Sequence, residues 1–141
     1  MNTGDEIIVG FEGVTISFGA RVRDHRGRLS SYGVTLMANG FSASVRVENT
    51  EDYGSPPSKF FSELAENWRG WEGQIKWRST EAELELIATS DPLGHIWVTA
   101  NVRPDAHPAR WRATASVMVE AGQLERLSHD FSSFFAFTPR E

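Results

Sequence analysis

The chain of 141 residues contains no cysteine, which excludes disulfide bonds and sites built on thiolates. A chain without cysteine suits a reducing compartment. The sequence also has no run of about 20 apolar residues, the length that a helix needs to cross a bilayer. The acidic N-terminal residues are not followed by an apolar stretch. We therefore expect no signal peptide and a cytoplasmic protein without a membrane partner.

Positive charge is also scarce, with 14 lysines and arginines against 19 aspartates and glutamates and a net charge of −5. A mildly acidic chain is poorly suited to phosphate backbones, so no nucleic acid is expected as a partner. The same charge would suit a basic protein surface, or it serves only to keep the protein soluble. The length indicates a single domain over residues 1–141.

Alternation of apolar with polar or small side chains predicts strands in the first third of the chain. The clearest strand covers residues 14–22, where every second residue is apolar. A second strand is expected at about residues 32–38 and a third at about 41–47, because Asn39-Gly40 between them is a strong hairpin signal. Another strand is expected before these, from Glu6 to Phe11.

A helix is expected after Pro56 and Pro57, because proline fits the first turn of a helix. Apolar residues at helical spacing continue it to Trp68, and Gly70 is placed to end it. The pattern then returns to strands, and a second amphipathic helix closes the chain. We expect strands at about residues 75–78, 82–86, 96–102 and 111–119, a turn at residues 91–94, and the second helix over residues 124–135.

The predicted order of elements is strands, helix, strands, helix. Neighbouring strands joined by short turns pair in antiparallel fashion, so the fold class is α+β. We expect an antiparallel sheet of about seven or eight strands, with both helices packed on one face and the other face open to solvent. The two halves are alike in outline, although no repeat is visible at the level of residues.

The sequence motifs of common enzymes are missing as well. There is no G-x-S-x-G nucleophile elbow, no Walker loop and no G-x-G-x-x-G. The histidines have no metal-ligand spacing; they are His25, His95, His107 and His129. We therefore interpret the chain as a protein that is not an enzyme and that uses neither a cofactor nor a metal ion.

Three glutamates recur at every second position, at Glu81, Glu83 and Glu85. This spacing would place them on one face of a strand. Together they would form an acidic stripe that could dock a protein, bind a divalent cation or serve as an acid and a base. They could equally be a solvated face that is balanced by basic residues on neighbouring strands.

Trp97 and Arg103 lie on the polar face of the next predicted strand. An exposed tryptophan among polar residues is typical of an interface anchor, although a loop could also cover it. Three other tryptophans are in register with apolar positions, and we expect them in the core; they are Trp68, Trp77 and Trp111.

Several short segments follow the order and spacing of a known pattern. They are Trp68–Gly73, Trp77–Leu84 and Gly94–Val98, with Asn39-Gly40-Phe41 before them and a closing helix from Gln123 that ends in aromatic residues. Together they resemble the WapI family of immunity proteins and a related group of uncharacterised small single-domain proteins. The likeness covers about Tyr32 to Phe135, and Ala82 stands where the pattern has a glycine.

This resemblance implies a cytoplasmic antidote that binds and blocks a toxin domain delivered by neighbouring cells. An acidic sheet face with exposed aromatic residues could plug a basic active site, because complementary charge speeds association and a few anchors supply most of the affinity. The residues expected to contact the toxin are Glu81, Glu83, Glu85, Trp97 and Arg103. The alternatives are a module that binds a small ligand or a metal ion on the open sheet face, and a homodimer that covers this face.

Overall fold

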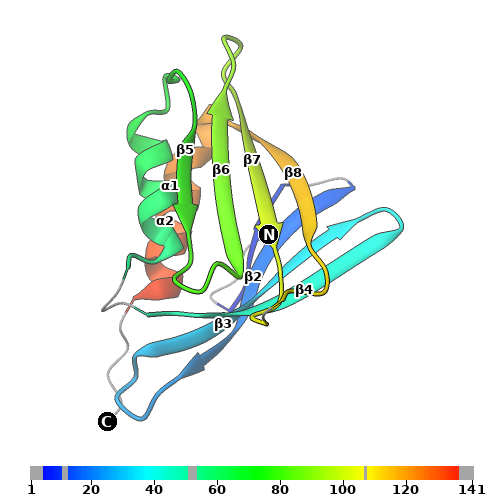
Figure 1. Ribbon diagram of the computed structural model, residues 1–141. Coiled ribbons are helices and arrows are strands. Elements are labelled where there is room, and N and C mark those ends of the chain that lie inside the picture. The colour runs from blue at the N-terminus through cyan, green and yellow to red at the C-terminus, as the bar shows by residue number, and fades with distance from the viewer. Residues whose placement is uncertain (1–4, 11–12, 51–53, 107, 137–141) are drawn as a thin grey trace.

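The computed structural model describes residues 5–10, 13–50, 54–106 and 108–136, and within these ranges it contains eight strands and two α-helices (Figure 1). The first half comprises β1 (Ile7–Val9), β2 (Val14–Arg23), β3 (Leu29–Ala38), β4 (Phe41–Glu48) and α1 (Pro57–Glu66). The second half comprises β5 (Ile75–Arg78), β6 (Leu84–Ser90), β7 (His95–Val102), β8 (Ala113–Glu120), a 3₁₀ turn (Ala121–Gln123) and α2 (Leu124–Phe135).

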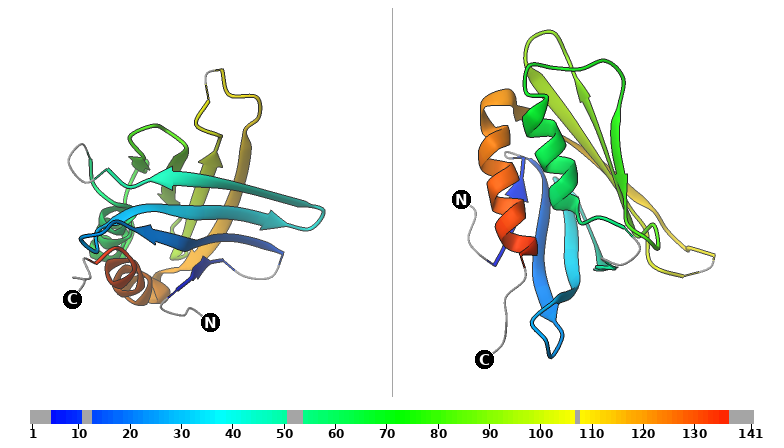
Figure 2. Two further views of the ribbon diagram at one scale, coloured as in Figure 1. Left: turned by 90° about the horizontal axis from the view of Figure 1, so that it is seen from below. Right: turned by 90° about the vertical axis from the view of Figure 1, so that its left-hand side faces the viewer.

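The strands form two antiparallel sheets of four, each in simple chain order. Strand β8 of the second sheet contacts β2 and β3 of the first, so the inner faces of the sheets pack against each other. The sheets cross at a steep angle and splay apart on one side, and there α1 and α2 lie side by side (Figure 2). Each sheet therefore turns one face to the core and leaves the opposite face uncovered by a helix.

Period-two alternation in the strands and helical spacing in α1 and α2 direct apolar side chains into one shared core. Its centre is aromatic. The Phe61 ring of α1 stacks on the Phe131 ring of α2 with centroids 3.9 Å apart, and the Phe18 ring of β2 meets Phe131 edge-on at 4.9 Å. These rings join both helices to the first sheet, and they account for the side-by-side packing of α1 and α2.

The α+β class, the antiparallel pairing and the order of strands and helices are confirmed. The strands divide into two sheets instead of forming one layer, and packing one sheet against the other buries an apolar face of each. The first strand begins at Ile7, and Phe11, its predicted end, lies outside the described residues. The hairpin at Asn39-Gly40 is present, with Gly40 at a φ of 86°.

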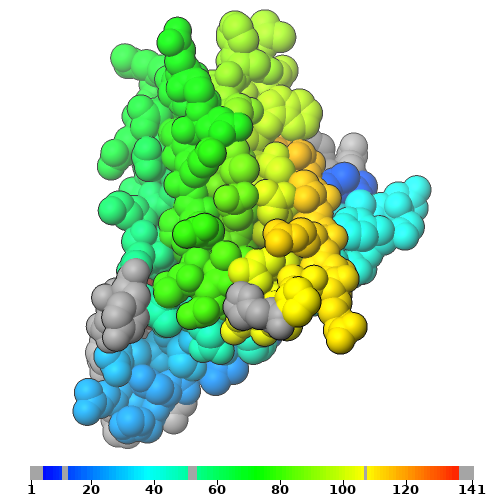
Figure 3. All heavy atoms as spheres, viewed as in Figure 1, coloured from blue at the N-terminus to red at the C-terminus, as the bar shows by residue number. Residues whose placement is uncertain are grey.

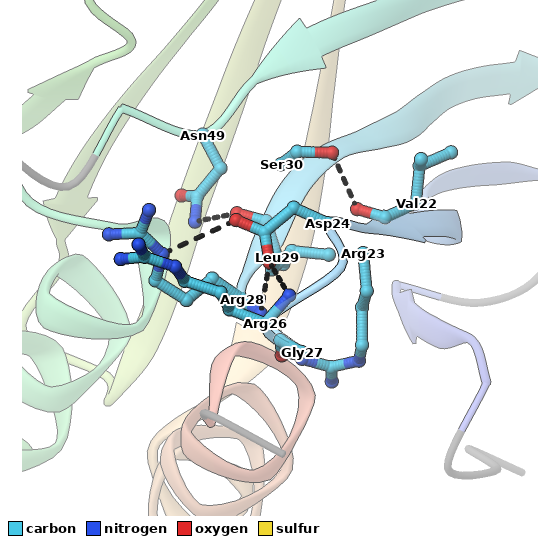
Figure 4. Close-up of polar contacts among 9 residues, drawn as sticks. All are labelled: Val22, Arg23, Asp24, Arg26, Gly27, Arg28, Leu29, Ser30 and Asn49. Carbon is cyan, nitrogen blue, oxygen red and sulfur yellow. Dashed lines mark hydrogen bonds and ion pairs between the residues drawn. The ribbon is translucent and has the colours of Figure 1, made fainter. Parts of the chain in front are cut away.

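The two halves share a turn that joins their second and third strands. In the first half, one Asp24 carboxylate oxygen accepts hydrogen bonds from the amides of Arg26 and Arg28, at 2.8 and 3.0 Å (Figure 4). The other oxygen lies 3.3 Å from the Arg28 guanidinium, and Gly27 has a φ of 87°. Burial raises the pKa of Asp24, but these hydrogen bonds outweigh it and leave the pKa below its usual value.

The second half repeats this turn between β6 and β7. The Asp91 carboxylate accepts hydrogen bonds from the amides of Leu93 and His95, at 2.8 and 3.1 Å, and Gly94 has a φ of 83°. The hydrogen bond from the His95 amide is the main reason that the pKa of Asp91 lies below its usual value. Both halves thus contain the same turn sequence, which is an aspartate, a glycine three residues later and a basic residue directly after the glycine. Each half is one four-stranded sheet followed by one helix.

Tyr32 gives the core a measurable pH dependence. Its side chain is buried, and this burial, together with the negative charge of Glu83, raises the pKa of the phenol well above its usual value. The folded protein keeps the Tyr32 proton where the unfolded chain releases it, at about pH 10. The free energy of unfolding should therefore be unaffected by this group below that pH and fall above it.

We expect Tyr32→Phe to remove the part of the alkaline loss of stability that comes from the Tyr32 phenol. In urea unfolding between pH 9 and 11, the fall in the free energy of unfolding should be shallower in the variant, by up to about 1.4 kcal/mol per pH unit for one proton. Equal slopes in the two proteins would contradict the assignment of alkaline sensitivity to Tyr32.

Candidate functional site

The outer face of the second sheet, formed by β5 to β8, carries the most varied side chains of the two open faces. Its strand register sets these side chains in rows. One row is Arg78, Glu85, Asn101 and Thr114, the next is Lys76, Ile87, Thr99 and Ser116, and the third is Thr89, Trp97 and Met118. Figure 3 looks onto this face, which is a broad surface running from β5 to β8. We call it the outer face of β5–β8.

Trp97 is the third residue of β7 on this face, and 44% of its surface is exposed. In the register it is flanked by Thr89 of β6 and Met118 of β8, and Ile87 lies one row away. The exposure of Trp97 is confirmed, but its neighbours are partly apolar. An exposed indole beside a methionine and an isoleucine has the composition of a protein interface core.

A chain of side-chain hydrogen bonds crosses the first row. Thr114 Oγ1 donates to Asn101 Oδ1 at 2.6 Å, and Asn101 Nδ2 donates to Glu85 Oε1 at 2.9 Å. These bonds fix the orientation of the Asn101 amide and hold the Glu85 carboxylate against the sheet. This part of the face is therefore ordered before any partner arrives.

Three arginines surround this polar row. They come from the end of β5 (Arg78), the residue after β7 (Arg103) and the segment before β8 (Arg112). With Glu85, Asn101 and Thr114 they line an open depression of about 450 Å³. We call it the arginine pocket. Arg103 is anchored by hydrogen bonds to the carbonyl oxygens of Glu81 and Pro104, at 2.9 and 3.3 Å.

The three predicted glutamates do not form a stripe. Glu81 is exposed in the turn before β6, Glu85 is half-buried on the outer face, and Glu83 is 0% exposed. The Glu83 carboxylate accepts hydrogen bonds from the Ser79 hydroxyl at 2.7 Å and from the Glu48 amide at 3.0 Å. Glu83 therefore joins the second sheet to the end of β4 in the first, and it is not available for contact with a partner.

The three glutamates do not share one face because the chain bends before β6. Ala82 has a φ of 59°, which lies in the left-handed region, and β6 begins only at Leu84. Adjacent residues Glu83 and Leu84 are both buried, an arrangement that regular strand alternation does not allow. Residues two apart do share one face in a regular strand. The prediction failed because the strand does not extend over Glu81 and Glu83.

The backbone of Ala82 also yields a prediction, since an L-residue in the left-handed region costs about 1–2 kcal/mol and glycine does not have this cost. We expect Ala82→Gly to raise the free energy of unfolding by about 0.5–1 kcal/mol, because glycine loses part of the gain to its greater freedom when unfolded. Urea denaturation measures it, with Ala38→Gly at the end of β3 as a control that should destabilise instead. A loss of stability in Ala82→Gly would contradict the assignment of strain.

Two of the three tryptophans that we expected in the core are exposed. Trp68 is 53% exposed because α1 ends at Glu66, before it, and Trp111 is 41% exposed because β8 begins only at Ala113. Trp77 packs against the core as predicted, and its Nε1 donates to the Ser55 carbonyl oxygen at 2.9 Å. The predictions for Trp68 and Trp111 were wrong because each lies just beyond the end of its element.

The outer face of β5–β8 is basic, contrary to the acidic face that we expected. Its positive side chains, including those lining the pocket, are Lys76, Arg78, Arg103 and Arg112, and its carboxylates are Glu85 and Glu120. This charge is the reverse of the net −5 of the whole chain. Lys76, Arg78 and Arg112 each follow a residue that we expected on the inner face of a strand, so alternation already indicated that they belong to this face.

The other open face, on β1–β4, combines hydroxyl side chains with larger ones, among them Met37, which is 53% exposed, and Arg46. Ser17, Thr35 and Ser44 form one of its rows, and the hydroxyls of Thr35 and Ser44 lie 2.8 Å apart. Thr99 and Ser116 on the outer face of β5–β8 form a matching pair at 2.7 Å. The two faces therefore share a hydroxyl pair between their third and fourth strands, but Trp97 and the arginine pocket belong to the second alone.

The histidines and carboxylates do not converge in the part of the chain that the structure describes, where no three of them form a cluster able to hold a metal ion. His95 begins β7 and contacts the carboxylates of Asp91 and Glu120, at 3.2 and 3.8 Å. His25 and His129 are exposed, and His107 lies outside the described residues. Over the same ranges, neither helix has the length and apolar character that crossing a bilayer requires.

Comparison with known proteins gives one match. Residues 8–138 match the family described as "Family of unknown function (DUF6228)". No curated protein matches the chain, and no solved structure does. The description of the family does not bear on the resemblance to WapI immunity proteins, which stays a prediction.

Proposed function

Since the chain belongs to the DUF6228 family, to which no function is assigned, we propose from its structure that it is a non-catalytic protein-binding module. Its partner docks on the outer face of β5–β8. The observation that carries this proposal is Trp97, an exposed indole on the third strand of an ordered, four-stranded face. Tryptophan and arginine are the residues that most often dominate the binding energy of protein interfaces.

The charge of this face defines the chemistry of the partner. Lysine and arginine side chains lie at both edges of the sheet, with Lys76 and Arg78 on β5 and Arg112 before β8. They flank one side of the apolar group of Trp97, Met118 and Ile87, and Glu120 lies in the row on the other side. Such a face is complementary to an acidic surface with an apolar centre, and opposite charge at the rim would speed association. The partner surface is thus acidic, the opposite of the one that the glutamates suggested.

The specific form of this proposal is an immunity protein that binds and occludes a cognate toxin domain, as the resemblance in residues 32–135 implies. Occlusion needs only a rigid surface of complementary shape and charge. The hydrogen-bonded row from Thr114 through Asn101 to Glu85 supplies such rigidity. Preorganised side chains lose little conformational freedom on binding, which favours a tight complex.

Binding of a small ligand is the second candidate, and the arginine pocket is the observation that favours it. Its volume of about 450 Å³ is large enough for a small molecule. Ligand pockets, however, are usually concave and mostly apolar. This depression is open and lined mainly by charged and polar side chains, so protein docking is the better account of the face.

Co-expression tests the proposal. The protein would be produced together with the C-terminal domains of secreted proteins that are encoded next to its gene, and growth and complex formation would be measured. We expect one such domain to be toxic alone, to be neutralised by this protein and to co-purify with it in a one-to-one complex. Failure of every linked toxic domain to form a complex would contradict the immunity proposal. A stable complex with a linked domain that is not toxic would keep the docking function alone.

A further inference from the structure

We propose that the arginine pocket is a carboxylate-binding site that receives an aspartate or glutamate side chain of the partner protein. This inference rests on the proposed docking function and deepens it, because it assigns the chemical group that fixes the position of the partner. The pocket lies on the same face as Trp97. Asn101 and Trp97 are four residues apart on β7, a distance of about 13 Å along a strand.

The pocket concentrates positive charge that the rest of the protein does not neutralise. Among the residues that the structure describes, the guanidinium groups of Arg78 and Arg112 form no hydrogen bond or ion pair, and both side chains are exposed. Glu85 is the one carboxylate of the lining, and it is already an acceptor for Asn101. Three guanidinium groups against one carboxylate leave the pocket net positive, although the chain as a whole is acidic.

The three arginines come from different elements, so they can approach one anion from several sides. Arg78 stands at the end of the edge strand β5, Arg112 precedes the opposite edge strand β8, and Arg103 follows β7 between them. Arg103 is held by the carbonyl oxygens of Glu81 and Pro104. A planar guanidinium can donate two parallel hydrogen bonds to a carboxylate, which gives orientation as well as affinity.

The lining favours a carboxylate over a phosphate group. Phosphate sites commonly use backbone amides from a helix N-terminus or a nest of successive N–H groups. Here the lining residues Glu85, Asn101 and Thr114 belong to paired strands, whose amides take part in the sheet ladders. The donors on these strands are therefore side chains, and the pocket opens on a face that we assign to a protein partner. An acidic side chain of the partner would fit the side-chain donors, and it would enter the pocket when the partner docks on this face.

The test uses a fluorescein-labelled hexaglutamate peptide as the probe and measures its fluorescence anisotropy with the intact protein at low ionic strength. Arg78→Gln and Arg112→Gln remove one pocket guanidinium each, and Arg110→Gln is the matched control. Arg110 is an exposed arginine two residues from Arg112 that does not line the pocket. We expect each pocket variant to weaken binding about tenfold or more, since hydrogen bonds to charged groups are among the strongest in proteins. The control should change it by less than about twofold.

Three results would overturn the proposal. Equal weakening by Arg110→Gln would show that general charge attracts the peptide without a defined pocket. Unchanged binding in both pocket variants would place the peptide elsewhere. If inorganic phosphate bound more tightly than the peptide and Arg112→Gln abolished this phosphate binding, the pocket would be a phosphate site.

The same variants separate this inference from the proposed function. A complex with the cognate domain that tolerates Arg78→Gln and Arg112→Gln but is lost in Trp97→Ala would remove the carboxylate site and keep the docking face. Peptide binding in the pocket with no protein complex at all would keep the site and remove the docking function. Circular dichroism and thermal unfolding of each variant would confirm that the fold is retained.

Discussion

Replacing Glu83 with alanine is expected to lower the free energy of unfolding by about 3–5 kcal/mol, the largest effect on stability that we predict. The carboxylate is fully buried and accepts hydrogen bonds from the Ser79 hydroxyl and the Glu48 amide. Each hydrogen bond to a charged group contributes about 1.5–3 kcal/mol, and its loss leaves a buried donor without a partner. Because Ser79 follows β5 of the second sheet and Glu48 ends β4 of the first, the loss also loosens the packing of one sheet on the other.

Glu81→Ala is the matched control for this prediction. Glu81 lies two residues away on the same turn, but its side chain is exposed. Substitutions at such positions usually change stability by no more than about 0.5 kcal/mol. Urea denaturation of both variants at neutral pH gives the comparison. Similar, small losses in the two would contradict the role of Glu83 as the polar link between the sheets.

Trp97→Ala is expected to weaken binding of the cognate domain by about 30-fold to several hundred-fold, the largest effect on function that we predict. Truncation of a central tryptophan anchor typically costs about 2–4 kcal/mol of binding free energy, and each 1.4 kcal/mol is about a tenfold change in affinity. Trp97 projects from β7, between Thr89 and Met118 of the neighbouring strands. Its removal would leave the apolar centre of the face without its largest side chain.

Trp68→Ala controls for the loss of an exposed indole as such. Trp68 is exposed to a similar degree, 53% against 44% for Trp97, but it lies beyond the end of α1 on the helical side of the molecule. Isothermal titration calorimetry with the purified domain should show near wild-type affinity for Trp68→Ala. A large loss in Trp68→Ala with little loss in Trp97→Ala would move the interface to the helices. Because Trp97 is a surface residue, its variant should keep the thermal stability of the wild type.

Much of the fold follows from local patterns in the sequence. Alternation over residues 14–22 marks β2, and the apolar spacing in residues 124–135 marks α2 within its observed bounds. The Asn39-Gly40 hairpin lies where it was predicted, because its turn needs a glycine with positive φ. These features depend on residues that are close together in the chain, and they can therefore be predicted without a structure.

The candidate site was only partly predictable, because it depends on contacts between distant segments. The exposure of Trp97 followed from its place in an alternating strand. The burial of Glu83 did not, because it depends on the left-handed turn at Ala82 and on a partner in β4. The arginine pocket likewise needs β5, β6, β7 and β8 in this order in one sheet. Alternation tells which residues of one strand share a face, but it does not tell which strands meet or where a strand begins.

The repeated architecture provides an internal control for locating the interface. Ser116 and Ser44 are exposed serines on the fourth strands of the two sheets, and each hydroxyl lies within hydrogen-bond distance of a threonine on the preceding strand. They differ in the face that they occupy. Ser116 shares its face with Trp97 and the arginine pocket, and Ser44 lies on the opposite, outer face of β1–β4.

Site-specific photo-crosslinking tests the central claim most directly. The photoreactive amino acid p-benzoylphenylalanine would replace Ser116 in one variant and Ser44 in another, and each would be irradiated with the toxin domain that co-expression identifies. We predict a covalent adduct from position 116 and none from position 44. An adduct from position 44 alone would contradict the claim that the outer face of β5–β8 is the docking surface.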